Sequence, residues 1–303
     1  MYRKRSELAP AALCLIFVVL IWGLNWLVIK DALRLAPPLF FTGLRLLGGA
    51  AAIAAVRVYL GYSLYVDRKA QLTVLIVGLL QMACGLGLSL IGLQYLDVGR
   101  SALIFYTMPL WLAIIEWVLD GRRQTLLEFG ALGCGLGGLA LLAVRSSSSV
   151  TAGGMAGAGL LLIAAICWAL GTWLANRSFT GSDLWSRTVF QLATSGAMVM
   201  LASLTFEPHF DISRLSTLAV PIAFNCIAAT GLAFVAWYYA LASLPACVAS
   251  QSLVLIPVVA LLSAAILQGE ELALRTILAC ALIVAGVTIT IWQRGAPALN
   301  RNT

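Results

Sequence analysis

Residues 10–30 read PAALCLIFVVLIWGLNWLVIK, and the run from Ala11 to Ile29 within this stretch has no charged side chain. A helix needs about 20 mainly apolar residues to cross a hydrocarbon layer about 30 Å thick. This run is long enough, and it ends at Lys30 and Asp31, where a span would return to water. We interpret it as a retained first transmembrane helix, because a signal peptide has a shorter apolar core and a small-residue cleavage site.

Similar apolar stretches follow along the whole chain, separated by short segments with charged or turn residues. The predicted spans cover residues 10–30, 36–57, 71–91, 99–119, 126–144, 154–175, 185–206, 218–241, 247–268 and 273–292. Hydrophobic residues make up 62% of the chain, charged residues only 10%, and the mean hydropathy is +0.99. Soluble domains carry about 25% charged residues. The composition therefore excludes a soluble protein and makes the lipid bilayer a partner.

The net charge of +7 does not indicate nucleic-acid binding, because the basic residues form no patch. They lie mainly in the short segments between spans, as the positive-inside rule predicts. With the N-terminus placed inside, twelve of the nineteen Lys and Arg residues fall on the inner side, six fall outside, and Arg45 lies within a span. We therefore expect both termini to be cytoplasmic.

The two halves of the chain resemble each other when one is shifted along the other. The aligned pairs are Trp22 with Trp168 and Arg45 with Gln191 at a shift of 146, and Pro109 with Pro257, Gly121 with Gly269 and Gly138 with Gly286 at a shift of 148. Each half of the chain contains five of the predicted spans. Because five is an odd number, the second half would enter the membrane from the side opposite to the first. We predict an all-α integral membrane protein of ten transmembrane helices, built as two inverted five-helix repeats, 1–148 and 149–303, around a central cavity. Chance similarity between apolar stretches is the alternative.

Four stretches also resemble a known family. They are WGLNWLVIKDAL and PPLFFTGLRLL (residues 22–33 and 37–47), VGRSALIFYTMPLWLAI (98–114) and PACVASQSLVLIPVVALLSAAILQGEEL (245–272). They resemble the EamA-type members of the drug/metabolite transporter (DMT) superfamily, including its YddG-type amino-acid exporters. The resemblance implies a multi-pass exporter in the bacterial inner membrane. It implies neutral or aromatic amino acids as substrates, with another metabolite or drug class as the alternative.

Polar side chains within the spans are the first candidates for substrate binding, because a polar group inside a membrane is costly. Arg45 could orient a substrate carboxylate, or it could pair with backbone carbonyls only to hold the fold. Asn25, Gln81 and Gln191 could bind the ammonium and carboxylate of a zwitterion, since each amide both donates and accepts. Hydrogen bonds between helices are the structural alternative for these three residues.

Aromatic side chains form a second group of candidates. Trp22, Asn25 and Trp26 recur at spacings of three and four residues and so share a helix face. Trp168 is the repeat partner of Trp22. Tyr106 and Trp237 also lie well inside predicted spans. Such rings could stack on an apolar or aromatic substrate, although packing between helices and anchoring at the interface are common roles for them.

The last candidates concern gating and proton coupling. Gln251 lies near the start of the ninth span and could belong to an inner gate or simply to a polar helix start. Pro109 and Pro257 occupy equivalent mid-span positions, where kinks could bend the two helices alternately or remain static. Glu116 could couple protons, but we expect it to pair with arginines near the inner surface.

Other classes of function lack their signatures. The spans contain no HExxH, GxSxG or Asp/His pair, so an intramembrane enzyme is not expected. The seven cysteines form no CxxC pair and there is one histidine, so we expect no metal and no cofactor. A channel would favour rings of like groups around an oligomer axis, whereas the internal repeat favours a monomeric carrier of a small molecule. No P-loop is present, so we expect substrate-gradient, proton or exchange-driven transport, with downhill facilitation favoured by the lack of a mid-depth carboxylate.

Overall fold

The computed structural model describes residues 8–96, 98–123, 125–143, 152–178, 183–268 and 274–300, and within these ranges the chain is helical without β-strands. The first helices are α1 (Leu8–Ala32), α2 (Pro38–Tyr59), α3 (Arg68–Gly78), the π-helix η2 (Leu79–Leu86), α4 (Gly87–Leu93), α5 (Val98–Phe105), α6 (Met108–Asp120) and α7 (Leu126–Ala143). They are followed by α8 (Ala152–Ser178), α9 (Leu184–Phe206), the 3₁₀-helix η3 (Ile212–Leu215), α10 (Ala219–Phe224), the π-helix η4 (Asn225–Leu232), α11 (Ala233–Ser243), α12 (Ala246–Ser252), the 3₁₀-helix η5 (Leu253–Leu255), α13 (Ile256–Gln268) and α14 (Leu274–Asn300).

Many of these helices are long and apolar enough to cross a bilayer. Among the described residues eight segments meet this condition by length and composition, and Leu126–Leu141 forms a shorter apolar helix. The chain is therefore a multi-pass membrane protein, as the composition predicted. The predicted span at 99–119 consists of two helices and not one, because α5 ends at Phe105 and α6 begins at Met108. Pro109 lies in the first turn of α6, where its missing N–H leaves no helical bond unmade.

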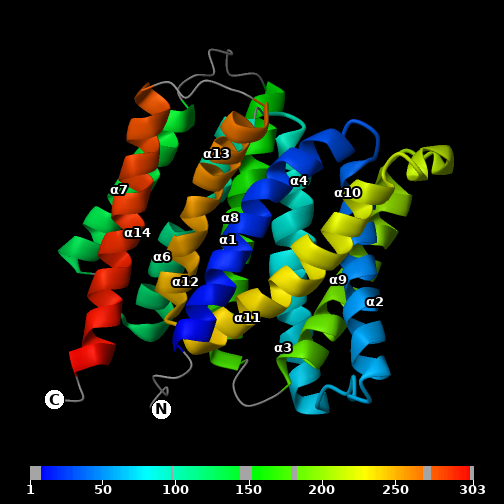
Figure 1. Ribbon diagram of the computed structural model, residues 1–303, viewed down its shortest axis with the longest axis horizontal. Helices are drawn as coiled ribbons and strands as arrows, with labels where there is room; N and C mark the ends of the chain where they lie inside the picture. Colours follow the sequence, from blue (N-terminus) through cyan, green and yellow to red (C-terminus); the bar gives the residue numbers. More distant parts are fainter. Residues whose placement is uncertain are drawn as a thin grey trace.

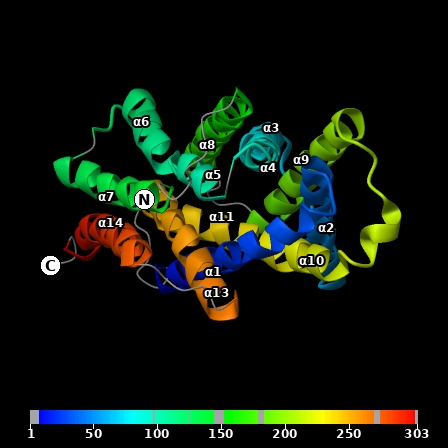
Figure 2. The ribbon, with the colours of Figure 1, turned by 90° about the horizontal axis from the view of Figure 1, so that it is seen from above.

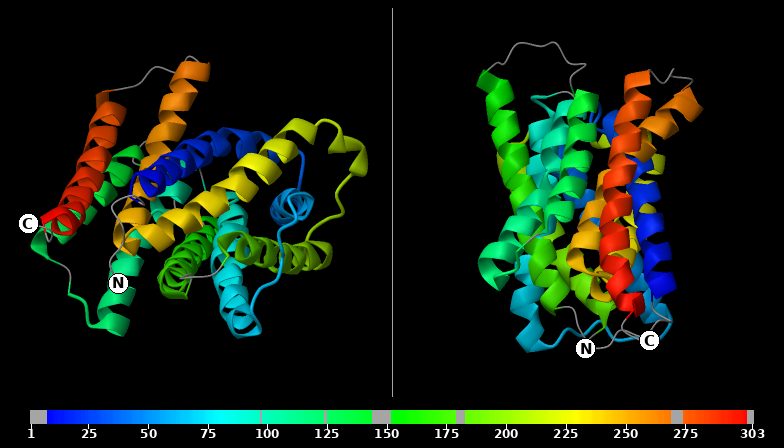
Figure 3. Two further views of the ribbon diagram at one scale, coloured as in Figure 1. Left: turned by 60° about the horizontal axis from the view of Figure 1, so that its bottom comes forward. Right: turned by 90° about the vertical axis from the view of Figure 1, so that its left-hand side faces the viewer.

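Successive segments run back and forth between two ends of the molecule (Figures 1 and 3). We call the end where α1 begins and α14 finishes the terminal end, and the other the distal end; the terminal end is at the bottom of Figure 1. Seen from above, α7 and α14 lie side by side at one edge, and α2 and α9 lie together towards the other (Figure 2). The segment α10–η4–α11 runs from the distal end at the α2 side toward the terminal end near α12.

Several element bounds recur at the two shifts found in the sequence. Both ends of η4 lie 146 residues after those of η2, and both ends of α13 lie 148 residues after those of α6. Each π-helix interrupts a long span, and a π-helix is rare and often marks a functional position. The break before α13 is a 3₁₀ turn, after which Pro257 follows in the first turn, as Pro109 does in α6.

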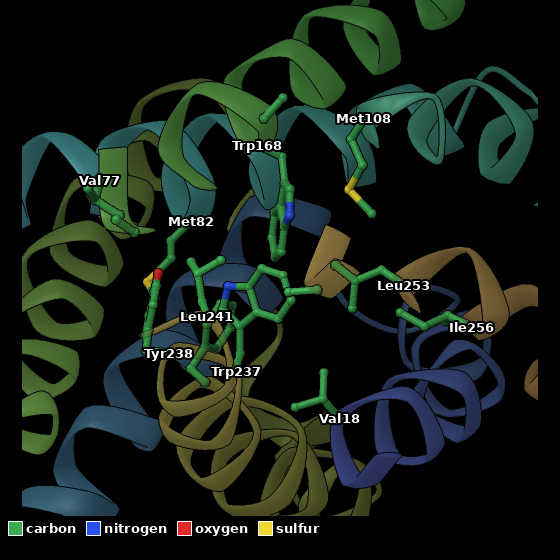
Figure 4. Close-up of a cluster of buried hydrophobic side chains, with 14 of the residues drawn as sticks. Val18, Val77, Met82, Met108, Trp168, Trp237, Tyr238, Leu241, Leu253 and Ile256 are labelled. Carbon is green, nitrogen blue, oxygen red and sulfur yellow. The ribbon is translucent and has the colours of Figure 1, made fainter. Parts of the chain in front are cut away.

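The core lies where α1, α8, α11 and the third span meet. Figure 4 shows Trp168 of α8, Met82 of η2, and Trp237 and Tyr238 of α11 close together there. All four side chains are at most 2% exposed. The indole of Trp237 lies 6.3 Å from that of Trp168, measured between ring centroids. Trp168 lies between this core and a cavity described below, since it belongs to both.

Candidate functional site

A narrow cavity of about 70 Å³ lies in the distal half of the molecule. Its walls come from α1, α2, η2, α4, α5, α6, α8, α11, η5 and α13 and the turn between α5 and α6. The lining residues are Trp22, Asn25, Trp26, Ile29, Arg45, Leu86, Ser89, Leu90, Phe105, Tyr106, Met108, Trp168, Phe234, Leu253 and Ile256. Typical ligand pockets measure about 300–1,000 Å³. The cavity is therefore narrow in the described conformation.

Arg45 supplies the positive charge of this cavity. It lies on α2 with only 4% of its surface exposed, and its Nη1 donates to Asn225 Oδ1 of η4 over 3.3 Å. Its Nε is buried without a hydrogen-bond partner, and no ion pair joins Arg45 to a carboxylate among the described residues. A buried charge lacking a counter-ion is expensive. The guanidinium therefore has unused capacity to bind an anion.

Two further polar groups of the cavity are unpaired. The Oδ1 of Asn25 and the Nε1 of Trp168 are both buried and have no hydrogen-bond partner within the described structure. One is an acceptor and the other a donor. Together with Arg45, they provide the cavity with two kinds of donor for an anionic group and one acceptor for a cationic group.

The aromatic walls are fixed by hydrogen bonds of their own. Trp22 Nε1 donates to the carbonyl of Ala229 in η4 over 2.8 Å, and Trp26 Nε1 donates to the Tyr106 hydroxyl over 3.1 Å. The ring centroids of Trp22 and Trp168 lie 5.7 Å apart in an edge-to-face arrangement. The rings are thus held in place and present apolar faces to the cavity.

Five predicted binding residues therefore line one cavity: Trp22, Asn25, Arg45, Tyr106 and Trp168. Trp26, which was predicted to share the helix face of Trp22 and Asn25, also lines the cavity. Sequence reasoning missed Ser89 and Phe234 as lining residues. Ser89 and Phe234 come from α4 and α11, and no pattern in the sequence shows that these elements face the cavity.

Gln81 and Gln191 lie outside this cavity, in a fully buried network. The Tyr238 hydroxyl donates to Gln81 Oε1 over 2.6 Å and accepts from Gln191 Nε2 over 2.8 Å. Gln81 Nε2 in turn donates to the Thr172 hydroxyl over 2.9 Å. The network joins η2, α8, α9 and α11 through their side chains. In the described conformation these two amides hold helices together, and a contact with substrate stays a prediction.

The remaining predicted residues lie around the site. Trp237 is fully buried behind Trp22 and Trp168, with its Nε1 unpaired. Gln251 and Pro109 line a smaller pocket beside α7, and Gln251 Nε2 donates to the carbonyl of Ala131 over 3.4 Å. Pro257 is buried in α13. Their roles in binding and gating stay predictions.

Glu116 forms the ion pair expected of it. Its Oε2 lies 2.6 Å from Arg122 Nη1, and Arg122 also reaches Glu128 over 3.4 Å. Arg122 belongs to the connection between α6 and α7 at the terminal end. The prediction that Glu116 pairs with a loop arginine is therefore confirmed, whereas its position near the inner surface of the membrane stays a prediction.

Comparison with known proteins yields transporters. The transporter YoaV of Bacillus subtilis, itself named as uncharacterized, is 26% identical over 90% of this chain and 94% of its own length. The inner membrane transporter YedA of Escherichia coli K12, also named as uncharacterized, is 28% identical over 96% and 94%. A probable amino-acid metabolite efflux pump of Salmonella typhimurium is 28% identical over 91% and 93%.

A solved crystal structure matches with a TM-score of 0.81 over 97% of this chain and 99% of that chain, at 19% sequence identity, which shows a shared fold. The sequence model of the EamA-like transporter family matches this chain twice, over residues 9–144 and 155–292. These two matches cover most of the chain, and the relatives are transporters and not enzymes. The chain belongs to the EamA-like transporter family.

Proposed function

We propose that this chain is a secondary transporter that exports neutral or aromatic amino acids across the bacterial inner membrane by alternating access. The observation that carries the proposal is the cavity around Arg45. A buried guanidinium with spare donor capacity lies there with an unpaired amide oxygen of Asn25 and several indole rings. A carboxylate, an ammonium group and an apolar or aromatic side chain would match these three features.

The relatives support the same substrate class. One of them is named a probable amino-acid metabolite efflux pump and aligns over most of both chains. Export is the direction that this name gives for that protein. The small volume of the cavity supports a carrier that closes around its substrate during transport.

The proposed mechanism depends on two inverted repeats, residues 1–148 and 149–303. The family model matches once in each half, and the two π-helices lie at the same shift as Trp22 and Trp168. Inverted repeats allow one half to take the conformation of the other, which would expose the site to each side in turn. The breaks that come just before Pro109 and Pro257, between α5 and α6 and at η5, would let these two spans bend during this exchange.

We further propose ten spans, a monomeric carrier and cytoplasmic termini. Arg57, Arg68, Arg122, Arg123 and Arg177 lie at helix ends on the terminal side. An excess of basic residues marks the cytoplasmic side. The cavity would then lie in the periplasmic half of the membrane.

Efflux from proteoliposomes tests the substrate class with three matched compounds. L-Phenylalanine has both charged groups, phenylalaninamide lacks the carboxylate, and 3-phenylpropionate lacks the ammonium group. We expect efflux of phenylalanine and strongly reduced efflux of both analogues, because a site built to pair a polar group rejects a ligand without it. Equal efflux of phenylalanine and phenylalaninamide would exclude a carboxylate site.

Substitution of Arg45 tests the residue that carries the proposal. We expect Arg45→Gln to reduce phenylalanine efflux about tenfold or more, since a hydrogen bond to a charged group contributes about 1.5–3 kcal/mol. Arg45→Lys retains the charge and should keep part of the activity. Arg34→Gln is the matched control, because the Arg34 side chain is 70% exposed at the distal end. Wild-type efflux by a monodisperse Arg45→Gln protein would contradict the assignment.

A further inference from the structure

Trp22 and Trp168 occupy equivalent places relative to the two π-helices, but only one of them forms a hydrogen bond there. Trp22 Nε1 donates to the carbonyl of Ala229 in η4. The shift of 146 that relates Trp22 to Trp168 also relates Ala229 to Ala83 in η2. Trp168 Nε1 is nevertheless buried without a hydrogen-bond partner. The two halves therefore differ at one pair of equivalent bonds.

The backbone of the π-helices differs at the same point. After η4, the N–H of Ala233 donates to the carbonyls of Ala228 and Thr230 and passes over Ala229, which accepts from Trp22. After η2, the equivalent N–H of Gly87 donates to the carbonyls of Ala83 and Cys84. The carbonyl of Ala83 thus accepts a hydrogen bond from a backbone N–H, whereas the equivalent carbonyl of Ala229 accepts one from an indole N–H.

Trp168 lies against η2 even though it does not bond to it. A Cβ atom on Gly85 of η2 would lie 3.3 Å from Trp168 Cε3, so the indole packs directly on this π-helix. The two π-helices also share a local form. A Cβ on Gly85 would lie 3.2 Å from the carbonyl oxygen of Leu80, and one on the equivalent Gly231 would lie 3.1 Å from that of Cys226. Similar backbones, each beside an equivalent tryptophan, thus hold different hydrogen bonds.

We propose that Trp22 and Trp168 are positioning residues that exchange these bonds during transport. The inference rests on the proposed function, in which each half takes the conformation of the other in the opposite state. In that state the Trp168–Ala83 bond forms and the Trp22–Ala229 bond breaks, with the backbone donors of Gly87 and Ala233 changing acceptors accordingly. Each state then leaves one indole N–H unpaired, so neither state gains a whole hydrogen bond over the other.

Opposite effects of two conservative substitutions test the exchange. Trp22→Phe removes a bond of the described state, and Trp168→Phe removes a bond of the opposite state. The reporter is a cysteine at position 89 (Ser89→Cys), which lines the cavity, in a protein whose seven native cysteines have been replaced. An impermeant thiol reagent added on the distal side then measures how accessible this cysteine is. We expect Trp22→Phe to slow labelling up to about threefold, because losing one hydrogen bond makes the described state less populated. The factor corresponds to the free energy of an average hydrogen bond in a membrane protein. Trp168→Phe should not slow labelling.

A second measurement follows the bond itself. In protein with ¹⁵N-labelled tryptophan, the indole N–H signal of Trp168 should move downfield in Trp22→Phe, because its bond to Ala83 becomes more populated. Trp292→Phe is the control, since Trp292 is 68% exposed on α14. It should change neither the labelling rate nor the Trp168 signal.

The outcomes separate this inference from the proposed function. If phenylalanine is transported but both tryptophan substitutions slow labelling equally, the exchange is wrong and the carrier assignment stands. The exchange is also wrong if labelling slows in Trp22→Phe while the Trp168 signal does not move. If labelling and the Trp168 signal respond as expected but no amino acid is transported, the substrate proposal is wrong and the exchange stands.

Discussion

At the scale of single residues, burial in the membrane core separates two kinds of polar side chain. Gln81 and Tyr238 bond to each other within a buried network that leaves only Gln191 Oε1 unpaired in the described structure, whereas Asn25 and Trp168 keep an unpaired atom at the cavity wall. A satisfied network stabilises one arrangement of helices. An unpaired polar group at a cavity lowers the stability of the protein, and a ligand that forms a hydrogen bond with this group removes that penalty. The second kind is therefore the better indicator of a binding site.

The network makes Tyr238→Phe a test of stability. Removing the hydroxyl leaves Gln81 Oε1 and Gln191 Nε2 without their common partner. We expect a loss of about 1–2 kcal/mol in unfolding free energy, at about 0.6 kcal/mol or more for each of the two hydrogen bonds. Thermal unfolding in detergent measures it. The neighbouring Tyr239 is only partly buried, and Tyr239→Phe should leave the unfolding temperature close to that of the wild type. Equal effects of the two substitutions would mean that the network contributes little.

At the scale of elements, α2 and α9 form an antiparallel pair that polar contacts hold together at both ends. At the distal end the Glu207 carboxylate accepts the N–H groups of Leu39 and Phe40, the first free donors of α2. At the terminal end Asp183 accepts the N–H of Trp185 in α9 and pairs with Arg57 of α2. Asp183 and Glu207, at the two ends of α9, thus each bind one end of α2.

Glu207→Ala tests the contact between Glu207 and the start of α2 at the distal end. The change leaves two buried N–H groups of α2 without an acceptor, and a lost helix cap costs about 1 kcal/mol. We expect a lower unfolding temperature with a smaller change in the affinity for phenylalanine, because Glu207 does not line the cavity. Asp31→Ala is the control, since Asp31 is 69% exposed and pairs only with Arg34 among the described residues. A large change in affinity with unchanged stability would place Glu207 in the substrate path instead.

The elements also show how far sequence patterns can lead. Apolar runs predicted most helix bounds because lipid requires length and apolarity from each span, so α2 at Pro38–Tyr59 corresponds to the predicted 36–57. The π-helices left no sign in the apolar pattern, because one extra residue per turn does not change composition. The network around Tyr238 was equally hidden, since it joins residues 157 positions apart. Arg45 and Trp168 could be found because each is conspicuous in its own span, whereas the partners of Gln81 depend on packing.

At the scale of the whole molecule, the placement of acidic groups bears on the energy source. The described carboxylates all lie within about one turn of a helix end, and none lines the cavity. Glu116, Asp120 and Asp183 pair with arginines, and Glu207 caps α2. A proton-coupled carrier needs a titrating group whose charge changes with substrate binding. The described cavity offers the permanent charge of Arg45 instead.

This distribution of charge leads us to predict downhill facilitation. We expect phenylalanine efflux from loaded proteoliposomes to keep its initial rate when ionophores collapse the proton gradient and the membrane potential, because no cavity carboxylate has to gain or lose a proton in the cycle. Equal phenylalanine concentrations on both sides should abolish net efflux while labelled substrate still exchanges, which distinguishes a carrier from a leak. If efflux stops once the proton gradient is collapsed, a carboxylate outside the cavity must take part, and the Glu116–Arg122 pair would then be the first to substitute.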